Sequence, residues 1–491
     1  MSGLPAAVDV LIVGSGPCGA TVARLVLDRV PTASVLIADA GPCLVGRPGV
    51  NVRNLDVAER TESEARCNAV EPGPRSRPVQ SGEVIEARPG THLLIPMGHA
   101  HADDVPGAAY SSNLGGMAAH WTCVTPRPEG SERIPFVPRS EMDEALATAE
   151  RLLAVTADGY QPTPRARSVR RRLEKSLGHL VTGDRPIQPM PLAGSARKDG
   201  QQPVWAGVDT ILRGGPQPQV ATDMLCRRIL ISDRRVTGAR FDDRRSDGHH
   251  TVRCRVMVVA AGAFHTPQLL WASGIRPAAL GRYLNVHPQV VAAVSTGASP
   301  APIERPPGDD RAHLSAVYWV PFNDRAHPWH GQILVAEPPG RDSAIVSLAW
   351  YVPKALDARC RIDLADDRLD HRGLPAPSVI HEIAATDRRM TDQALSIVAE
   401  TAAALGQYLS NGEPRVLVSG KSLHYQGTTR MGPRDDGKSV CDTTGHIWGV
   451  DGLYVAGPGV IPTATACNPT LTAVALASIA ADNIAKALLD P

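Results

Sequence analysis

The chain has 491 residues, of which 43% are hydrophobic and 21% charged, a composition typical of a globular protein with more than one domain. Its 51 basic and 50 acidic residues leave a formal net charge of +1, which excludes a charge-based case for nucleic acid or a membrane as partner. The nine cysteines are scattered and form no Cys-x-x-Cys pair, which argues against a disulfide framework and a zinc site. Because the first residues also lack a signal-peptide pattern, we expect a cytoplasmic protein.

The first 39 residues have the pattern of a strand, a helix and a second strand. Residues 8–14 are a continuous apolar run that ends in glycine, which predicts a strand buried on both faces. A helical pattern follows through Leu27, and the apolar run from Val35 to Ala38 then ends at Asp39. Strand, helix and strand within about thirty residues form one βαβ unit.

Three glycines at the first strand–helix junction, Gly14, Gly16 and Gly19, have the spacing of a dinucleotide-binding turn. The first glycine permits the tight turn, the second lets a pyrophosphate approach the backbone, and the third lets helix and strand pack closely. Asp39 stands where an acidic residue would bind a ribose hydroxyl. These residues predict a bound dinucleotide, but they do not distinguish NAD from FAD.

Residues 51–110 are polar, rich in proline, glycine and histidine, and show little periodicity. We therefore expect a long loop or lid segment that carries short strands at most. His99 and His101 alternate within this segment, but no third ligand follows at a recognised spacing. No metal site is predicted.

The middle of the chain changes character. Residues 166–177 have a helical pattern, and residues 220–260 contain strand-like pieces that end in a buried parallel strand over 256–261. Several short β-rich runs separated by turn residues then follow between residues 312 and 384. They predict an antiparallel sheet, an architecture that differs from that of the two ends.

Two segments near the carboxyl terminus combine polar residues with tight turns. His424 precedes a glycine-rich turn, and Asn468 with Pro469 stands at the start of an apolar helix over 469–489. Asn followed by Pro is a favoured N-cap pair, and the buried start of such a helix favours an anionic partner. Taken alone, Asn468 is explained as a helix cap and His424 as a hydrogen-bonded core histidine.

With these motifs in place, the chain resembles the glucose-methanol-choline (GMC) oxidoreductases. The stretch from Ala261 to Leu270 is similar to the second signature of that family, and His424 matches the catalytic histidine of its His-x-x-Gly-Thr motif. Asn468 matches the position of the catalytic partner, which is histidine or asparagine across the family. The resemblance implies FAD as the cofactor.

Residues 115–123, Gly-Gly-Met-Ala-Ala-His-Trp-Thr-Cys, are similar to a stretch of the pyranose oxidase branch. In that branch the histidine before tryptophan carries the flavin, so the resemblance implies a covalent link at His120. Ala118 and Ala119 replace the Ser-Thr of the fungal enzymes, and the chain is markedly shorter than theirs. Shorter bacterial relatives include enzymes that oxidise glycosides, among them C-glycosides, at the C3 hydroxyl.

The resemblance implies a role for individual residues. His424 would be the catalytic base, which suits imidazole because its pKa of about 6.5 lies near the operating pH. Asn468 would be the second catalytic residue, with its amide NH2 toward the reacting oxygen and its carbonyl capping the helix. The residues expected to bind FAD are Gly14, Gly16, Gly19, Asp39, Gly116, Met117, His120, Trp121, Thr122, Cys226, Ala261, Gly457, Pro469 and Thr470.

The predicted fold class is α/β (mixed α+β), with a Rossmann-like FAD-binding domain and an interleaved substrate domain built on an antiparallel sheet. We expect the FAD-binding domain to combine residues 1–125, which include the lid segment over 51–110, with residues 216–290 and 440–491. The substrate domain would combine residues 126–215 and 291–439.

The predicted function is FAD-dependent oxidation of a secondary hydroxyl, at C2 or C3, of a pyranose sugar or glycoside, including C-glycosides. The hydride would pass to flavin N5, and oxygen (giving hydrogen peroxide) or a quinone would accept the electrons. Three alternatives stay open: a non-redox lyase that keeps FAD, an oxidase of a non-sugar alcohol, and a flavin-binding protein without turnover. The sequence leaves the oligomeric state open.

Overall fold

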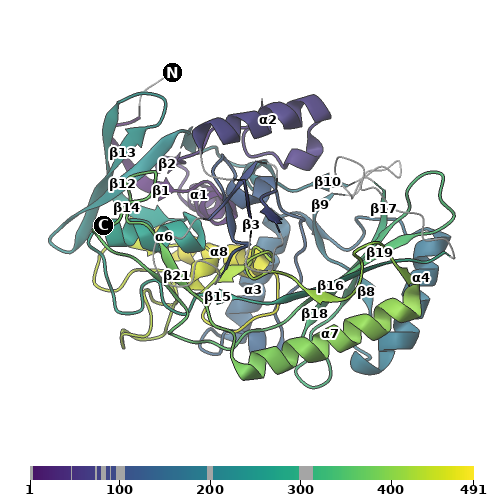
Figure 1. The fold of residues 1–491 in the computed structure, drawn as a ribbon. Helices are drawn as coiled ribbons and strands as arrows, with labels where there is room; N and C mark the ends of the chain where they lie inside the picture. The colour runs from purple at the N-terminus through teal and green to yellow at the C-terminus, as the bar shows by residue number, and fades with distance from the viewer. Residues whose placement is uncertain are drawn as a thin grey trace.

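The computed structural model describes residues 4–45, 47–71, 75–78, 84–88, 90–94, 105–195, 203–297 and 313–490. His99 and His101 lie outside these ranges. Two large sheets, each with its own hydrophobic core, organise the described part of the chain (Figure 1).

The first sheet is mainly parallel and is assembled from distant parts of the sequence. Its strand order is β11-β2-β1-β14-β13-β12, and β25 pairs with β14. Strand β1 pairs in parallel with both β2 and β14, and β25 is parallel to β14, whereas β12 and β13 form an antiparallel hairpin. The strands are β1 (Ala7–Val13), β2 (Val35–Ala38), β11 (Gln219–Ala221), β12 (Met224–Ser232), β13 (Arg235–Asp243), β14 (His249–Val259) and β25 (Leu453–Val455).

Three helices pack together beside this sheet: α1 (Pro17–Arg29), α3 (Arg139–Leu152) and α8 (Pro469–Leu489). Helix α8 contacts both of the others, and its apolar residues belong to the core of the first sheet. By length and composition alone α8 could cross a membrane, but 72% of its most apolar stretch is buried inside the protein. It is therefore the core helix of this half, as its all-round apolar pattern predicts.

The second sheet is antiparallel, as predicted, and has the order β22-β16-β19-β18-β17-β8, with β23 paired to β16. Helix α7 (Ala385–Leu405) contacts β16 and β19, and α4 (Pro164–Leu177) contacts α7, so both helices cover one face of this sheet (Figure 1). The strands are β8 (Gln188–Pro189), β16 (Gln289–Ser295), β17 (Leu314–Val320), β18 (His330–Ala336), β19 (Ile345–Tyr351), β22 (Gln407–Tyr408) and β23 (Arg415–Val416).

The remaining elements connect and cover the two sheets. The helices are α2 (Val57–Val70), α5 (Val208–Leu212) and α6 (Gly262–Ala272), with 3₁₀ turns at Val52–Asn54, Gly116–Ala119, Gly130–Glu132, Gly178–Leu180 and Pro458–Val460. The short strands are β3 (Ser76–Pro78), β4 (Val84–Glu86), β5 (Thr91–Leu93), β6 (Ala109–Ser111), β7 (Val155–Thr156), β9 (Leu192–Ser195), β10 (Val204–Trp205), β15 (Asn285–Val286), β20 (Arg361–Asp363), β21 (Ser378–Ile380) and β24 (Tyr425–Gln426).

Two details differ from the sequence-based expectations. The segment over 51–110 contains the 14-residue helix α2, which begins with a reciprocal capping box between Asp56 and Glu59 and has a mostly exposed surface. The expectation of a loop is therefore wrong over 57–70. In addition, the β-rich run near residue 380 forms β21, which pairs only with β20 in a separate two-stranded sheet.

Candidate active site

A cavity of about 390 Å³ is lined from both halves of the fold. One part of its wall comes from the turn after β1, the segment over 116–122 and the starts of α6 and α8, and another part comes from β16, β18 and β19. The predicted site residues in the wall are Gly14, Gly16, Asp39, Gly116, Met117, Trp121, Thr122, Ala261, His424, Gly457, Asn468, Pro469 and Thr470. The structure thus brings the two ends and the middle of the chain to one cavity.

In the glycine turn, Gly16 has open space beside its Cα atom, whereas Gly19 is packed against the backbone. Gly14 has φ +102°, and a Cβ atom on Gly19 would lie 2.1 Å from the carbonyl oxygen of Gly14, so only glycine fits at the third position. A Cβ atom on Gly16 would meet nothing within 4 Å, because this residue faces the cavity. Gly16 is also the N-cap of α1 and makes no side-chain cap, so the amides of the first helical turn are available to phosphate oxygens.

These two positions predict different consequences for the same substitution. Gly16→Ala should leave the stability of the cofactor-free protein unchanged and weaken FAD binding about tenfold, or about 1.4 kcal/mol, because the added methyl group occupies space beside the phosphates. Gly19→Ala should instead lower the melting temperature of the cofactor-free protein, since its methyl group clashes with the backbone. Flavin titration and thermal melts of both variants check this; equal FAD affinity in Gly16→Ala and wild type would contradict it.

Asp39 lies directly after β2, and its carboxylate accepts hydrogen bonds from the backbone amides of Ser15 (2.9 Å) and Gly41 (2.8 Å). The Ser15 hydroxyl also donates to Asp39 and accepts from the amide of Gly115, so it ties the glycine turn to the 115–122 segment. Burial raises the pKa of Asp39, and the hydrogen bonds from Ser15 and Gly41 oppose that rise. Ser15 was not predicted from the sequence.

Three predicted FAD-binding residues, Gly19, His120 and Cys226, lie outside the cavity wall. His120 is buried, and its Nε2 lies 2.9 Å from the side-chain oxygen of Asn113. Burial lowers the pKa of His120 to about 3, so the ring is neutral and donates from Nε2 to Asn113. Cys226 is buried within β12 as part of the first core, and burial raises the pKa of its thiol. Neither of these two side chains lines the cavity. The flavin-binding roles of His120 and Cys226 stay predictions.

His424 lies opposite His287 because two short strands pair. Strand β15 pairs antiparallel with β24, and the register matches Val286 with Tyr425. His287 follows Val286 and His424 precedes Tyr425, so the two histidines are neighbours across the ladder. Their rings meet edge to face at 4.8 Å, and His287 Nε2 lies 2.7 Å from His424 Nδ1.

The hydrogen bonds around this pair determine where each proton resides. His287 Nδ1 lies 2.8 Å from the carbonyl oxygen of Thr465, which only accepts, so His287 carries its proton on Nδ1. The Nε2 of a neutral His287 must then accept from Nδ1 of His424. His424 Nε2 is therefore unprotonated, with a lone pair that can accept a hydrogen bond. His287 was missed in the sequence, since its partner is 137 residues away.

Asn468 directs its side chain at this lone pair. Its Nδ2 lies 3.1 Å from His424 Nε2, and both residues line the cavity. The expectation that its carbonyl group also caps α8 is wrong: Asn468 occupies the N-cap position, but its side chain makes no cap hydrogen bond. The start of α8 thus faces the cavity uncapped, with free first-turn amides and the positive end of the helix dipole.

Burial keeps both histidines neutral. It lowers the pKa of His424 well below the usual 6.5, and the nearby positive charges of His287, when protonated, and Arg88 act in the same direction. Burial also lowers the pKa of His287 to about 4, although its hydrogen bond to Thr465 opposes this. At neutral pH the pair therefore carries no charge, and Nε2 of His424 can accept a proton.

The second sheet contributes polar side chains to the same cavity. Gln289 on β16, Gln332 on β18 and Tyr351 on β19 all line it. Gln289 donates to the Tyr351 hydroxyl (3.2 Å), which donates to Gln332 (3.4 Å). The Tyr351 ring also packs 5.0 Å from the ring of His424. These amides and the phenol offer both donors and acceptors to a polyhydroxylated ligand, and none of the three was predicted.

The cavity fits FAD on observations of its own wall. Three helices, α1, α6 and α8, begin at the cavity without a side-chain cap, so backbone donors are available at three places in its wall. The open face of Gly16 matches the approach of a pyrophosphate, and Asp39 stands at the end of β2 where a ribose would lie. The residues present therefore suit a dinucleotide whose pyrophosphate lies at the start of α1 and whose negatively charged ring lies at the start of α8.

Comparison with known proteins gives consistent matches over the chain. Two family models described as GMC oxidoreductase match residues 196–289 and 357–477. A C-glycoside 3-oxidase from Microbacterium trichothecenolyticum is 43% identical, with 98% of this chain and 97% of the relative covered. A second C-glycoside 3-oxidase, from Arthrobacter globiformis, is 42% identical over 99% of this chain and 96% of its own length. A pyranose 2-oxidase from Tricholoma matsutake is 28% identical over 98% and 94%.

Solved structures support the fold. A pyridoxine 4-oxidase from Mesorbium loti superimposes with a TM-score of 0.62 at 16% identity and covers 97% of this chain and 99% of its own. A formate oxidase from Aspergillus oryzae gives a TM-score of 0.66 at 13% identity and covers 99% of both chains. The predicted fold class, with its Rossmann-like and antiparallel parts, is confirmed, and the family suggested by the sequence motifs is confirmed by the relatives. The chain belongs to the GMC oxidoreductase family, whose cofactor is FAD.

Proposed function

We propose that this protein oxidises a secondary hydroxyl group of a pyranose glycoside, C-glycosides included, at C3. The observation that carries the proposal is the unprotonated Nε2 of His424, which accepts a hydrogen bond from Asn468 in a cavity that offers polar groups suited to a sugar. The C3 position is supported by the relatives named C-glycoside 3-oxidase, which at 43% and 42% identity are closer than the pyranose 2-oxidase at 28%.

The residues of the chain would handle the proton. A substrate hydroxyl that enters between His424 and Asn468 would replace their mutual hydrogen bond, donate its proton to Nε2 and accept from the Asn468 amide. His424 then becomes a cation, which the lone pair of His287 Nε2 continues to support through Nδ1–H. FAD, when bound, would supply the acceptor for the hydride that leaves the same carbon. With dioxygen as final acceptor, alcohol and oxygen give ketone and hydrogen peroxide.

The sugar would be oriented by the second sheet. Gln289, Tyr351 and Gln332 form a chain of hydrogen bonds along the cavity wall, so an entering ring hydroxyl can exchange partners with them. The first-sheet side would hold FAD through the glycine turn, Asp39 and the amide ends of α1 and α8.

FAD held without a covalent bond is the expected result for this chain. His120 uses Nε2 to donate to Asn113, and its ring packs against Gly90 outside the cavity wall. Acid precipitation of the holoenzyme should therefore release all flavin into the supernatant. Flavin that stays with the washed pellet, and is lost from it in a His120→Ala variant, would establish the covalent link instead.

The pH dependence follows from the lowered pKa of His424. A base is active when unprotonated, so a pKa well below 6.5 keeps it active throughout the neutral range. We expect kcat/KM to be level above pH 6.5 and to fall only in distinctly more acidic solution. Initial rates measured between pH 5 and 8 check this, and an acid limb with its midpoint at 6.5 or above would contradict it.

A panel of free sugars, O-glycosides and C-glycosides tests the function directly. Peroxide release under air and the regiochemistry of the ketone identify the substrate class and the carbon. Anaerobic addition of each compound separates the redox proposal from a lyase: bleaching of the yellow flavin by a good substrate supports oxidation. A substrate that is converted while the flavin stays oxidised without oxygen would overturn it, and peroxide formation only with non-sugar alcohols would reassign the substrate.

A further inference from the structure

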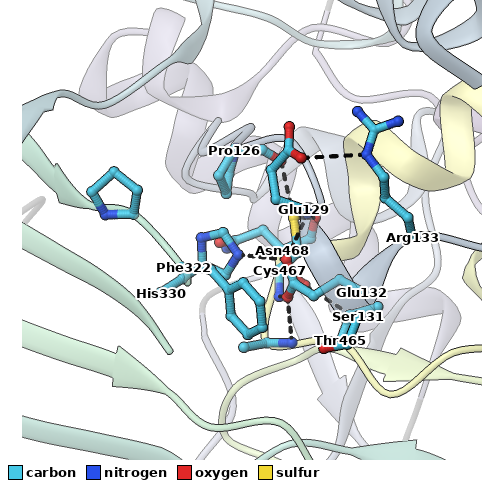
Figure 2. Close-up of polar contacts among 12 residues, drawn as sticks. Pro126, Glu129, Ser131, Glu132, Arg133, Phe322, His330, Thr465, Cys467 and Asn468 are labelled. Carbon is cyan, nitrogen blue, oxygen red and sulfur yellow. Dashed lines mark hydrogen bonds and ion pairs between the residues drawn. The ribbon is translucent and has the colours of Figure 1, made fainter. Parts of the chain in front are cut away.

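A second polar cluster lies next to the site and takes no part in the chemistry proposed above. Glu132, His330 and Cys467 are all buried, and one donor atom from each lies within 4.8 Å of the others (Figure 2). Cys467 immediately precedes Asn468, so this cluster adjoins the active-site wall. Three such residues could hold a metal ion, and their hydrogen bonds decide whether they do.

The hydrogen bonds leave no ligand atom free for a metal. His330 Nδ1 accepts from the indole N–H of Trp319 (3.0 Å), which is a donor only, so the proton of a neutral His330 resides on Nε2. That N–H donates to Glu132 Oε2 (2.9 Å). The Cys467 thiol donates to the carbonyl oxygen of Pro126, and burial raises the pKa of the thiol. Each group that would bind an ion is already engaged as a hydrogen-bond partner.

Glu132 instead holds a segment of backbone. Its Oε1 accepts from the backbone amides of Ala466 (2.8 Å) and Cys467 (2.9 Å). The backbone carbonyl oxygen of Glu132 accepts from the hydroxyl of Thr463 (2.9 Å). The amide of Glu129 donates to Oε2, beside the bond from His330. The carboxylate thus accepts four hydrogen bonds with no exposed side-chain surface, which a carboxylate can do with both oxygens.

The segment over 463–468 carries both contacts that govern the base. The carbonyl oxygen of Thr465 keeps the proton of His287 on Nδ1, and this in turn keeps the proton of His424 on Nδ1. Asn468, at the end of the same segment, faces His424 Nε2. Glu132 accepts hydrogen bonds from the amides of the two residues that lie between Thr465 and Asn468 (Figure 2). A shift of this segment would therefore change the contact of Thr465 with His287 and that of Asn468 with His424 together.

We propose that Glu132 is a positioning residue for the base: it holds the segment over 463–468 in the conformation that keeps Nε2 of His424 unprotonated and aligned. Trp319 and His330 support this role. The indole N–H of Trp319 occupies Nδ1 of His330, so His330 donates to the Glu132 carboxylate from its Nε2–H. The proposal rests on the role of His424 given above.

Glu132→Gln tests this with little change in shape. One amide oxygen can still accept from Ala466 and Cys467. The NH2 group then faces two donors, the Nε2–H of His330 and the backbone N–H of Glu129, and donors repel each other. We expect kcat to fall about 10- to 100-fold, a range typical of small misplacements near reacting groups, with KM for the best glycoside within about twofold of wild type. The KM expectation follows because the hydrogen bonds of Gln289 and Gln332 run to Tyr351 and not to Glu132. Asp387→Asn is the matched control: this buried carboxylate accepts from the amide of Ala355 and lies outside the cavity wall, so kcat should stay at the wild-type value.

A second substitution separates positioning from general damage. Trp319→Phe removes the N–H group that fixes the proton of His330. In the double variant the His330 ring can therefore carry its proton on Nδ1, and its Nε2 can accept from the amide NH2 group introduced by Glu132→Gln. We expect Glu132→Gln with Trp319→Phe to recover part of the kcat lost by Glu132→Gln alone. Simple structural damage predicts the opposite, a double variant slower than either single variant.

Each outcome bears on the proposal. A Glu132→Gln variant with wild-type kcat, or a double variant slower than the single one, overturns the positioning role. One equivalent of metal in the purified protein, lost in Glu132→Gln, overturns it in favour of a metal site. A failure of the proposed function gives a different result. Full turnover in His424→Ala would show that His424 is not the base. A slow His424→Ala variant together with an unaffected Glu132→Gln variant would contradict only the positioning role of Glu132.

Discussion

Replacing His424 with alanine should lower kcat about 10²- to 10⁴-fold on the best sugar or glycoside substrate, the range that a general base contributes. The imidazole is neutral, its lone pair faces the cavity, and Asn468 is the polar group beside it. Because the glycine turn, Asp39 and the start of α1 make no hydrogen bond to His424, flavin content should stay at the wild-type level. Steady-state rates and the flavin absorption spectrum of the purified variant measure both quantities.

The effect must be distinguished from the loss of any buried imidazole. His381→Ala serves as the control, since burial lowers the pKa of His381 to about 3 and this residue lies outside the cavity wall. We expect this variant to lose stability but to keep kcat within about threefold of wild type, a difference of less than about 0.7 kcal/mol. A His424→Ala variant that turns over as fast as His381→Ala would remove His424 from the mechanism.

The parts of this site that could be predicted from sequence are those with local signals. The glycine turn is encoded within six residues, between an apolar run that predicts a buried strand and a helical pattern. The structure places Gly14 and Gly16 in the cavity wall. Taken separately, His424 is explained as a core histidine and Asn468 as a helix cap. Only the resemblance to a family indicated that the two residues act in one site. Their 3.1 Å contact spans 44 residues and depends on how β24 and α8 are packed.

What could not be predicted depends on pairing at long range. His287 owes its role to the register between β15 and β24, and no periodicity within either two-residue strand reveals it. Helix α7 was not predicted because its buried face consists largely of small or polar residues, such as Thr391, Ala394 and Thr401, which give little hydrophobic contrast. For α2 the pair Asp56 and Glu59 was the one available signal, a capping box ahead of a helix that buries little.

Glu71 has no motif around it, yet in the described part of the chain its carboxylate contacts three basic side chains. Its side chain has no exposed surface and pairs with Arg244 (2.7 Å), Arg372 (2.8 Å) and His371 (2.6 Å). It also accepts from the hydroxyl of Tyr110, a residue of the cavity wall. These contacts join the end of α2, the residue after β13 and the turn at 371–372, which are far apart in the sequence.

Glu71→Gln should therefore destabilise the protein by about 3–5 kcal/mol, because it leaves buried cations without their counter-charge. Glu62→Gln on the same helix is the control: Glu62 pairs with Arg66 at the surface, and such pairs contribute at most about 1 kcal/mol. Denaturant unfolding of wild type and both variants measures the difference, and equal losses in the two would contradict the role given to Glu71.

The same contacts determine how the stabilisation by Glu71 depends on pH. Burial alone would raise the pKa of Glu71, but its hydrogen bond to His371 and the charges of Arg372 and Arg244 outweigh burial and lower it. A carboxyl group with a lowered pKa in the folded state stabilises fully above its unfolded pKa of about 4.3 and loses this contribution as the pH falls further. The gap between wild type and Glu71→Gln should accordingly be constant at neutral pH and narrow below about pH 4.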